Sequence, residues 1–495
     1  MSIELPVLNG QKLQDDRPQE NCGIVGIIDL SGGESIHRAV AMLSAINHRG
    51  SDMAGFATLN HGFHRTRGYG YVKDIFTDQR IQSSHLEGSA TIGHTRYKIQ
   101  GGKTLSFAQP ILATHEDRTI ALAHNGNVPN TEAMMETLRS RGIRPKKNFD
   151  SSLLAQLIVS GEGDDWIEKV QNGLKGVMGS YSLTMLTDDG HLIGVRDPWG
   201  NRPLSMAEVD NGVAFASESK AFPMVKGRNR YELNPGQIVD VSKEGMLTSE
   251  LLEKAQQRTC AFEYIYFAYE TSVIGGVTVS TYRKELGASL ARNHPGQGTV
   301  ATAVPESACV MANAYAHERG IPIERLIIKS PHTVGRSFMQ GEMGDRVNTI
   351  ETKFVISPDM EGADVEIEDD SVVIGNTARY LIATTKNDYG AGRVDFRSGS
   401  PKLKRDCPWG VNMRSTDGQF IAVDDQGNER SNEEIAKDLG ADSVAFPSLP
   451  EVYDVATKVG LEPQSLCYEC FDGPGLQPAI LKDTKPVRKI FTFAD

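Results

Sequence analysis

The chain contains little cysteine, fewer basic than acidic residues, and no long apolar run. Six cysteines among 495 residues are too few for a disulfide scaffold, and in a reducing compartment they indicate catalysis, metal binding or burial. No segment approaches the roughly 18 consecutive apolar residues of a membrane span. The net charge of -12 argues against a nucleic-acid surface as the main role. We therefore expect neither a membrane nor a nucleic acid as a partner.

The first 21 residues lack the apolar core of a secretory signal and contain Asp15, Asp16 and Glu20. A cytoplasmic location is therefore the default expectation. The chain is too long for one ordinary core, and its length predicts two to four compact units. We expect a leader over 1–21, a first domain over 22–259, a second domain over 260–459 and a tail over 460–495.

Two different patterns of apolar residues divide the chain. Up to about residue 241, short apolar runs recur between Gly, Asn and Asp residues, which is typical of stacked sheets flanked by helices. From about residue 263, longer helical patterns alternate with single apolar strands, as in a parallel α/β sheet. The expected strands include 23–30, 119–123, 181–186, 213–217, 299–304 and 325–328, and the expected helices include 35–47, 131–140, 151–160, 282–292 and 307–319.

Cys22 follows a polar leader and opens the apolar segment Gly23–Gly26. If the chain is cut after Asn21, Cys22 carries a free amine next to its thiol. A thiol with a pKa of about 8.5 needs a base, and a terminal amine with a pKa of about 8 supplies one near neutral pH. The other interpretation of this segment is a buried cysteine at the start of a core strand.

Four short motifs follow one another in the first half of the chain. They are Cys22–Gly26, His48–Gly55, Gly93–Tyr97 and His124–Asn127. In order and spacing they resemble the class II, or amino-terminal-nucleophile, glutamine amidotransferases. The resemblance implies an α+β sandwich of stacked antiparallel sheets flanked by helices. It also implies that the Cys22 thiol attacks the carboxamide of glutamine, forms a thioester and releases ammonia.

The resemblance further implies an oxyanion hole made by the Asn125 side chain and the Gly126 backbone N–H. Acyl transfer needs such donors, because negative charge develops on the carbonyl oxygen. Taken alone, an Asn-Gly pair more commonly forms a hairpin turn.

Glutamine binding is assigned in the same way, by resemblance. Arg96 is expected to hold the α-carboxylate of glutamine and Asp150 its α-ammonium group. Arg49 and Gly50 are expected to position the substrate. For a single Arg or Asp, a solvated surface role is the commoner alternative. Two further motifs, 179–182 and 196–204, match framework segments of the same family.

The second half of the chain carries a second resemblance. Its segments are Cys260–Ala268, Val304–Ser307, Gly335–Phe338 and Asp369–Thr377. They resemble the amidophosphoribosyltransferase family, in which a type I phosphoribosyltransferase domain follows the glutamine-splitting domain. The resemblance implies an α/β parallel-sheet domain that binds phosphoribosyl pyrophosphate together with Mg2+.

In that family two adjacent acids contact the ribose hydroxyls, and the next loop wraps the 5'-phosphate at the start of a helix. An ordinary strand-to-helix turn is the alternative interpretation of this loop. The resemblance assigns phosphoribosyl binding to Asp369, Asp370, Ser371, Gly375, Asn376 and Thr377, with Lys329 and Arg336 as cationic partners.

The loop and the strand before it depart from the family pattern. Ile374 stands where the family has Arg, and Asn376 stands where it has Thr. The strand reads Val365–Glu368, and two glutamates in a central parallel strand are unfavourable unless they are paired. An alternative is that 371–374 forms the strand and 375–377 a shortened loop.

Four cysteines match the ligands of an iron-sulfur cluster in one branch of the family. They are Cys260, Cys407, Cys467 and Cys470. The resemblance implies a four-iron four-sulfur cluster with a structural role. The Cys-x-x-Cys pair alone equally fits a zinc or redox site. Cys309 is expected in the core.

Together the resemblances imply a glutamine-dependent enzyme of purine biosynthesis that makes phosphoribosylamine, glutamate and pyrophosphate, and we expect a homo-oligomer. Two other hypotheses stay open. A glutaminase paralogue would deliver ammonia to a different acceptor; this is suggested by Ile374 and by the segment Lys329–Thr333, where Pro331 falls in a stretch that has lost one of the family's cations. A scaffold or regulatory protein would retain an inactive second domain that only binds nucleotides or phosphates.

Overall fold

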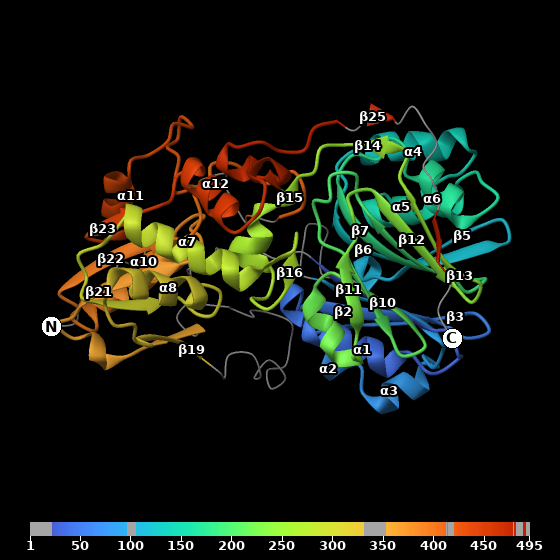
Figure 1. Cartoon of the computed structure of the whole chain (residues 1–495), viewed down its shortest axis with the longest axis horizontal. Coiled ribbons are helices and arrows are strands. Elements are labelled where there is room, and N and C mark those ends of the chain that lie inside the picture. Colours follow the sequence, from blue (N-terminus) through green and yellow to red (C-terminus); the bar gives the residue numbers. More distant parts are fainter. Residues whose placement is uncertain are drawn as a thin grey trace.

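The chain folds into two lobes that lie side by side (Figure 1). The computed structural model describes residues 22–96, 105–330, 353–411, 413, 420–478, 480–481 and 489–491. The expected leader, residues 1–21, lies outside these ranges. None of the helices in the described ranges is both long and apolar enough to cross a bilayer.

The first lobe is a sandwich of two antiparallel sheets, each with seven strands among the described residues. One sheet has the order β11-β9-β10-β1-β4-β2-β3, and the other has the order β26-β13-β12-β8-β7-β6-β5. The first sheet contains β1 (Gly23–Asp29), β2 (Met53–Leu59), β3 (Phe63–Tyr69), β4 (Ala90–Arg96), β9 (Ser205–Val209), β10 (Gly212–Ala216) and β11 (Arg228–Glu232). The second contains β5 (Ile111–His115), β6 (Arg118–Asn127), β7 (Ser180–Thr187), β8 (Leu192–Arg196), β12 (Gln237–Ser242), β13 (Gly245–Glu250) and β26 (Lys489–Phe491).

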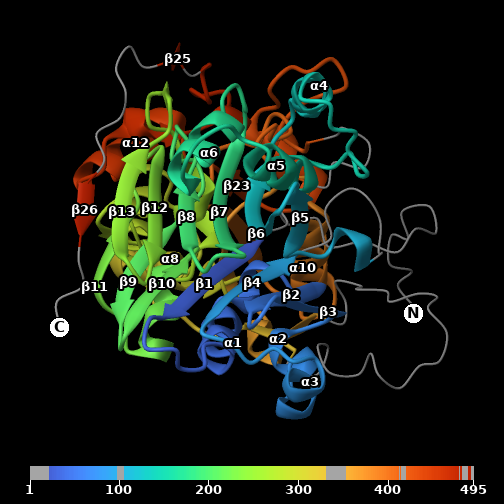
Figure 2. The ribbon, with the colours of Figure 1, turned by 90° about the vertical axis from the view of Figure 1, so that its right-hand side faces the viewer.

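Helices cover the outer face of each sheet (Figure 2). Apolar side chains such as Ile24, Leu186 and Phe215 fill the space between the sheets. The first sheet carries α1 (Ile36–Ala45), α2 (Val72–Ile75) and α3 (Asp78–Ser83), and the second carries α4 (Thr131–Ser140), α5 (Asp150–Val159) and α6 (Trp166–Gly173). This arrangement confirms the expected α+β sandwich.

The tail of the chain returns to the first lobe. Strand β26 pairs with β13, with Met246 opposite Phe491. Strand β25 (Ile480–Leu481) pairs with β14 (Glu253–Lys254). The sequence did not predict these strands, because two or three residues at a sheet edge are too few to produce a recognisable alternation.

The second lobe is built on a parallel sheet of four strands among the described residues, in the order β18-β21-β22-β23. Apolar residues of α10 and α11 cover one face, and α8 packs on β18 and β21. This confirms the expected α/β domain. The strands are β18 (Val300–Ala303), β21 (Asp364–Asp369), β22 (Arg393–Ser398) and β23 (Ser443–Ala445), and the helices are α7 (Val279–Asn293), α8 (Cys309–Arg319), α10 (Asn376–Asn387), α11 (Asn432–Leu439) and α12 (Leu449–Lys458).

The strand expected at 325–328 does not join this sheet. It appears as β19 (Ile327–Lys329), which pairs antiparallel with β20 (Phe354–Ile356) in a separate pair. The reason is that the edge of β18 is already occupied. The Ala301 N–H donates to the Pro322 carbonyl over 2.9 Å, and the Glu324 N–H donates to the Ala301 carbonyl over 2.9 Å.

Strand β21 has one apolar and one acidic face. Val365 and Ile367 belong to the core under α10 and α11. Glu366 is buried but paired, because it accepts hydrogen bonds from the Tyr315 hydroxyl and, over 3.0 Å, from Arg319 Nη2. The strand ends at Asp369, so the alternative that placed a strand at 371–374 is wrong.

Candidate functional site

Cys22 lies immediately before β1, and only 5% of its surface is exposed. Two hydroxyl groups fix the backbone that follows it. The Gly23 N–H donates to Thr95 Oγ1 over 3.3 Å, and the Ile24 N–H donates to Ser217 Oγ over 3.0 Å. The thiol is therefore held at the end of a strand in the middle of its sheet.

Three of the predicted glutamine-binding residues supply the charges around this thiol. Burial raises the pKa of Cys22, the Arg96 charge lowers it, Asp150 raises it and Arg49 lowers it again. Burial prevails, and the pKa lies above its usual value. A buried thiol of this kind needs a base before it can act as a nucleophile.

Arg96 and Asp150 are held by backbone groups near Cys22. Arg96 is the last residue of β4, and its Nη1 donates to the Phe107 carbonyl over 2.6 Å. Asp150 begins α5, and its carboxylate accepts from the N–H groups of Val128 (3.3 Å) and Ser151 (2.6 Å). The two side chains bring opposite charges to one thiol, which matches the carboxylate and ammonium groups of an amino acid.

Asn125 and Gly126 lie within strand β6, so the hairpin-turn interpretation of this pair is wrong. Neither polar atom of the buried Asn125 side chain has a hydrogen-bond partner in the described part of the chain. Opposite Gly126, the Tyr181 N–H donates to Asp197 Oδ2 over 3.1 Å and the Tyr181 carbonyl accepts from the Asp197 N–H over 2.9 Å. The Gly126 N–H therefore points away from β7. An oxyanion hole needs two such donors.

Arg49 lies in a completely buried ion network beside Cys22. Its Nε donates to the Cys22 carbonyl over 3.3 Å, its Nη1 to Glu218 over 2.8 Å and its Nη2 to Glu263 over 2.8 Å. Burial alone lowers the pKa of Arg49, but Glu263 and Glu218 outweigh it and raise the pKa. Arg49 therefore contacts the backbone of Cys22, and its guanidinium is engaged by carboxylates instead of facing open space.

Gly50 allows two segments of the site to approach closely. A Cβ atom at Gly50 would lie 2.6 Å from the Arg96 carbonyl carbon. The Gly50 carbonyl accepts from Asn47 Nδ2 over 2.5 Å. Gly50 thus determines how near Arg96 can come to the segment that follows Asn47.

His124 and Ser151 belong to the site but were not assigned from the sequence. His124 Nδ1 lies 3.0 Å from Ser151 Oγ and 3.8 Å from Asp150 Oδ2. Burial lowers the pKa of His124, although the Asp150 charge opposes this. The His124 N–H also donates to Gln109 Oε1 over 2.7 Å. The sequence did contain a signal for His124, because the motif His124–Asn127 places this histidine directly before Asn125, the expected oxyanion donor.

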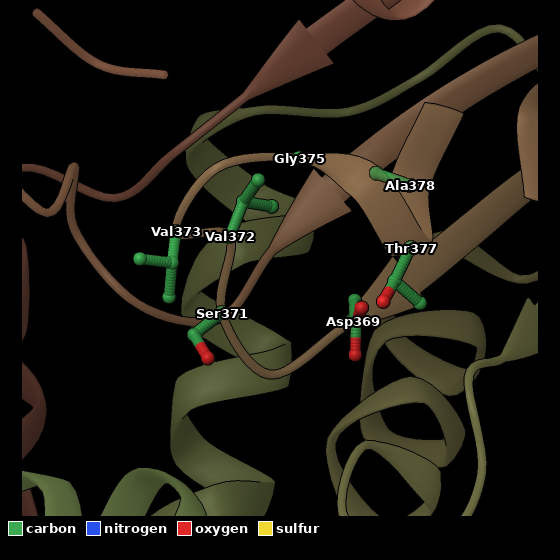
Figure 3. Close-up of a pocket in the computed structure, with 7 residues that line it drawn as sticks. All are labelled: Asp369, Ser371, Val372, Val373, Gly375, Thr377 and Ala378. Carbon is green, nitrogen blue, oxygen red and sulfur yellow. The ribbon is translucent and has the colours of Figure 1, made fainter. Parts of the chain in front are cut away.

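The loop after β21 lines a small cavity (Figure 3). Asp369, Ser371, Gly375 and Thr377 contribute to a volume of about 10 Å³, enough for about one water molecule. Figure 3 shows the Asp369 carboxylate beside the Thr377 hydroxyl. Gly375 has φ +90°, and Asn376 begins the 12-residue helix α10. The backbone N–H groups and the dipole at the start of a helix attract anions.

Hydrogen bonds order the second acid of this loop. Asp370 accepts from Ser371 Oγ over 2.8 Å and from the Ser307 hydroxyl, and its N–H donates to Asp369 Oδ1 over 2.9 Å. Both aspartates are buried. The paired acids are therefore held in a defined arrangement next to the loop that leads into α10.

The cations expected at this loop are only partly described. Lys329 is an exposed residue of β19, and Arg336 lies outside the described residues. Arg379, one turn into α10, donates from Nη1 to the Ile374 carbonyl over 3.0 Å and from Nη2 to Asp438 over 3.0 Å. Its charge is thus largely satisfied by Asp438.

The four predicted cluster cysteines converge between the lobes. Cys260 and Cys467 are opposite each other in the parallel pair β15 (Thr259–Cys260) and β24 (Leu466–Cys467). Cys407 and Cys470 lie close enough that the thiols affect one another's ionisation. Burial, followed by the neighbouring thiols, raises the pKa of Cys470 well above its usual value, and burial raises that of Cys260 to about 12.

These thiols suit a cluster in number, type and burial. The Trp409 N–H donates to Cys407 Sγ over 3.4 Å, and the backbone N–H groups of Phe262 and Glu469 bond to Cys260 and Cys467. Such bonds stabilise ligating thiolates. Among the described residues, no group of three His, Cys, Asp or Glu side chains is arranged to hold a metal ion as it stands. The cluster therefore stays a prediction.

Comparisons with known proteins cover nearly the whole chain. Residues 94–224 match the family described as "Glutamine amidotransferase domain". The chloroplastic amidophosphoribosyltransferase of Vigna aconitifolia is 34% identical, with 95% of this chain and 94% of that protein covered. The amidophosphoribosyltransferase of Archaeoglobus fulgidus is also 34% identical, with 91% and 96% covered.

A solved structure agrees with the sequence comparisons. The glutamine phosphoribosylpyrophosphate amidotransferase from B. subtilis, complexed with ADP and GMP, matches with a TM-score of 0.81 and 29% identity. The match covers 94% of this chain and 99% of that one. Both lobes are therefore shared with it, in the same arrangement.

Proposed function

The chain belongs to the amidophosphoribosyltransferase family, and on this premise we propose how its two lobes carry out the family reaction. It is a glutamine-dependent transferase that releases ammonia from glutamine and transfers it to phosphoribosyl pyrophosphate. The products are phosphoribosylamine, glutamate and pyrophosphate. One observation supports the first step most directly. The charged side chains of Arg96 and Asp150 both act on the buried thiol of Cys22.

In the first lobe, the Cys22 thiolate attacks the amide carbon of glutamine while Arg96 and Asp150 hold the amino-acid end. The carbonyl oxygen becomes an oxyanion that accepts hydrogen bonds from Asn125 Nδ2 and the Gly126 N–H. The C–N bond then breaks. The amide nitrogen takes up the proton lost by the thiol and leaves as ammonia, and water hydrolyses the thioester to glutamate.

The base for this step is proposed to be the α-amine of Cys22. Because burial raises the pKa of the thiol, a base beside it is needed near neutral pH. Cleavage after Asn21, which lies outside the described residues, would free this amine. Mass spectrometry of the mature amino terminus tests the proposal, and an intact Met1 in active protein would contradict it.

In the second lobe, ammonia attacks C1 of the ribose and the bond to pyrophosphate breaks. We propose that Asp369 and Asp370 hold the ribose hydroxyls. The start of α10, with Thr377, would hold the 5'-phosphate. Ile374 brings no positive charge to this loop. Mg2+ bound together with the diphosphate would supply positive charge there.

The proposed cluster would be held by Cys260, Cys407, Cys467 and Cys470. Their positions support a structural role, since they join the lobe junction, the segment around Cys407 and the tail. A cytoplasmic location and a homo-oligomeric assembly also stay predictions.

One experiment separates this function from the alternatives. Purified, iron-replete protein is incubated with glutamine, with and without phosphoribosyl pyrophosphate and Mg2+, and glutamate and pyrophosphate are measured. We expect both products in equal amounts when all components are present. Glutamate without pyrophosphate would identify a glutaminase with another acceptor, and the lack of both products would favour a scaffold.

A further inference from the structure

A short segment from the second half of the chain lies directly on the expected oxyanion strand of the first lobe. We call Pro408–Gly410 the bridge segment. The Trp409 carbonyl accepts hydrogen bonds from Ser180 Oγ over 2.6 Å and from Arg202 Nη2 over 2.7 Å. Both donors are buried residues of the sandwich. The motifs around Ser180 and Arg202, which the sequence indicated as framework, therefore contact the other half of the chain.

The bridge segment also bonds to β6 itself, one residue beyond Gly126. Asn127 Nδ2 donates to the Pro408 carbonyl over 2.9 Å. The Asn127 N–H donates to Ser180 Oγ over 3.3 Å, and the same hydroxyl donates onward to Trp409. Ser180 thus links the end of β6 to the bridge segment through a single oxygen atom.

Close packing adds to these hydrogen bonds. Gly410 has φ +101°, and a Cβ atom there would lie 2.6 Å from Asn127 Cβ and 3.4 Å from the Gly126 carbonyl carbon. The backbone of Gly410 therefore rests on the Gly126–Asn127 peptide, and no larger residue fits without moving it.

The end of β6 depends on such outside support. Gly126 has φ +147°, and a Cβ there would lie 2.0 Å from the Ser180 carbonyl oxygen. The backbone groups of Tyr181 opposite Gly126 are bonded to Asp197 instead of β6. The ladder thus does not fix the Gly126 N–H, and small shifts of Asn127 would turn this donor away from a bound glutamine.

We infer that the bridge segment positions the oxyanion donors Asn125 and Gly126, so that the second half of the chain sets the rate of glutamine cleavage in the first lobe. The inference rests on the proposed function only in taking Asn125 and Gly126 as these donors. It makes Asn127, Ser180 and Gly410 positioning residues. Cys407 immediately precedes the bridge segment, so a substitution at Cys407 would also alter the position of the end of β6.

The test uses Gly410→Ala in the full-length enzyme. We expect kcat for glutamine hydrolysis to fall by about 10- to 100-fold, within the loss caused by removing one oxyanion donor, while KM for glutamine changes less than about threefold. Phosphoribosylamine formation from added ammonia should stay within about twofold. Asn127→Ala, a milder change, should give the same pattern with a smaller loss.

Binding measurements distinguish positioning from general damage. Glutamate γ-semialdehyde adds to a thiol and forms a tetrahedral adduct, so its affinity reports the oxyanion hole. Its affinity should fall by the same factor as kcat/KM, while the affinity for glutamate stays unchanged. The control is Gly427→Ala, because Gly427 also has a positive φ, +82°, but a Cβ there meets nothing within 4 Å.

Two results would overturn the inference. One is an unchanged kcat for glutamine hydrolysis in Gly410→Ala, and the other is an equal loss of glutamine-dependent and ammonia-dependent activity. If the parent enzyme makes no pyrophosphate from phosphoribosyl pyrophosphate and ammonia, the proposed function fails. Glutamine hydrolysis and aldehyde affinity still decide the inference in that case.

Discussion

The Arg49 guanidinium forms two hydrogen bonds with the Glu263 carboxylate, 2.9 Å from Nη1 to Oε2 and 2.8 Å from Nη2 to Oε1. Both side chains are fully buried. Arg49 belongs to the first lobe, and Glu263 belongs to a π-helical turn, Glu263–Phe267, at the junction. Since Arg49 also contacts the Cys22 carbonyl, this pair connects the nucleophile to the start of the second lobe.

Removal of the Arg49 charge should destabilise this junction. We expect Arg49→Met to lower the free energy of unfolding by about 3 to 5 kcal/mol, because Glu263 and Glu218 lose a buried partner. Urea unfolding measures the loss. The control is Arg228→Met, which breaks an exposed pair with Asp210 and should change stability by less than about 1 kcal/mol. Equal losses in the two variants would contradict this role for the Arg49 pair.

Replacement of the nucleophile should separate the two half-reactions. We expect Cys22→Ser to reduce glutamine-dependent activity by at least about 1000-fold, because a hydroxyl is far less nucleophilic than a thiolate at neutral pH. Activity with added ammonia should persist. Product assays with each nitrogen source measure the two rates.

The control for this variant is Cys309→Ser. Cys309 is the first residue of α8, outside the glutamine site, and its replacement should spare both activities. If Cys22→Ser instead loses ammonia-dependent activity as well, Cys22 has a structural role.

The sequence predicted the two sheet systems because their apolar patterns are local, whereas Arg96, Asn125, Gly126 and Asp150 were assigned to the glutamine site by resemblance to the family. The apolar run after Cys22 and the helical spacing of α1 and α5 follow directly from residue order. The sequence did not predict that Arg49 pairs with Glu263, or that Trp409 accepts a hydrogen bond from Ser180. Each of these contacts joins residues about 200 positions apart, and no local pattern reports them. The sequence also did not predict that β19 pairs with β20, because this pairing depends on the segment that already occupies the edge of β18.

The four cysteines proposed to hold a cluster give a metal-content prediction. Protein purified without oxygen should contain about four iron and four sulfide ions per chain, as a cluster held by four thiolates requires. Cys470→Ser should lose most of both and the visible absorbance of the cluster. Cys309→Ser, which also serves as the control for Cys22→Ser, should keep them. Elemental analysis that finds one zinc ion per chain in place of iron would contradict the cluster.

Glu368 is expected to make the stability of the second lobe depend on pH. Its side chain is fully buried, and neither carboxyl oxygen has a hydrogen-bond partner in the described parts of the chain. Burial, followed by the nearby Glu366 charge, raises its pKa well above the usual value, although Arg397 opposes the shift. In the unfolded chain the pKa is about 4.3. The folded state therefore keeps a proton that the unfolded state releases, and stability falls as pH rises from about 4.3 towards the folded pKa.

Glu368→Gln removes this titration while keeping the size of the side chain. We expect the stability of the variant relative to the parent to increase as pH rises from 5 to 8, by at most about 1.4 kcal/mol per pH unit. Glu366→Gln is the matched control, because Glu366 accepts from Tyr315 and Arg319 and its replacement should destabilise the lobe over the whole range. Thermal unfolding at several pH values measures both. If the Glu368→Gln and parent curves run parallel, Glu368 does not change its protonation on unfolding, and its charge must be stabilised in the folded lobe.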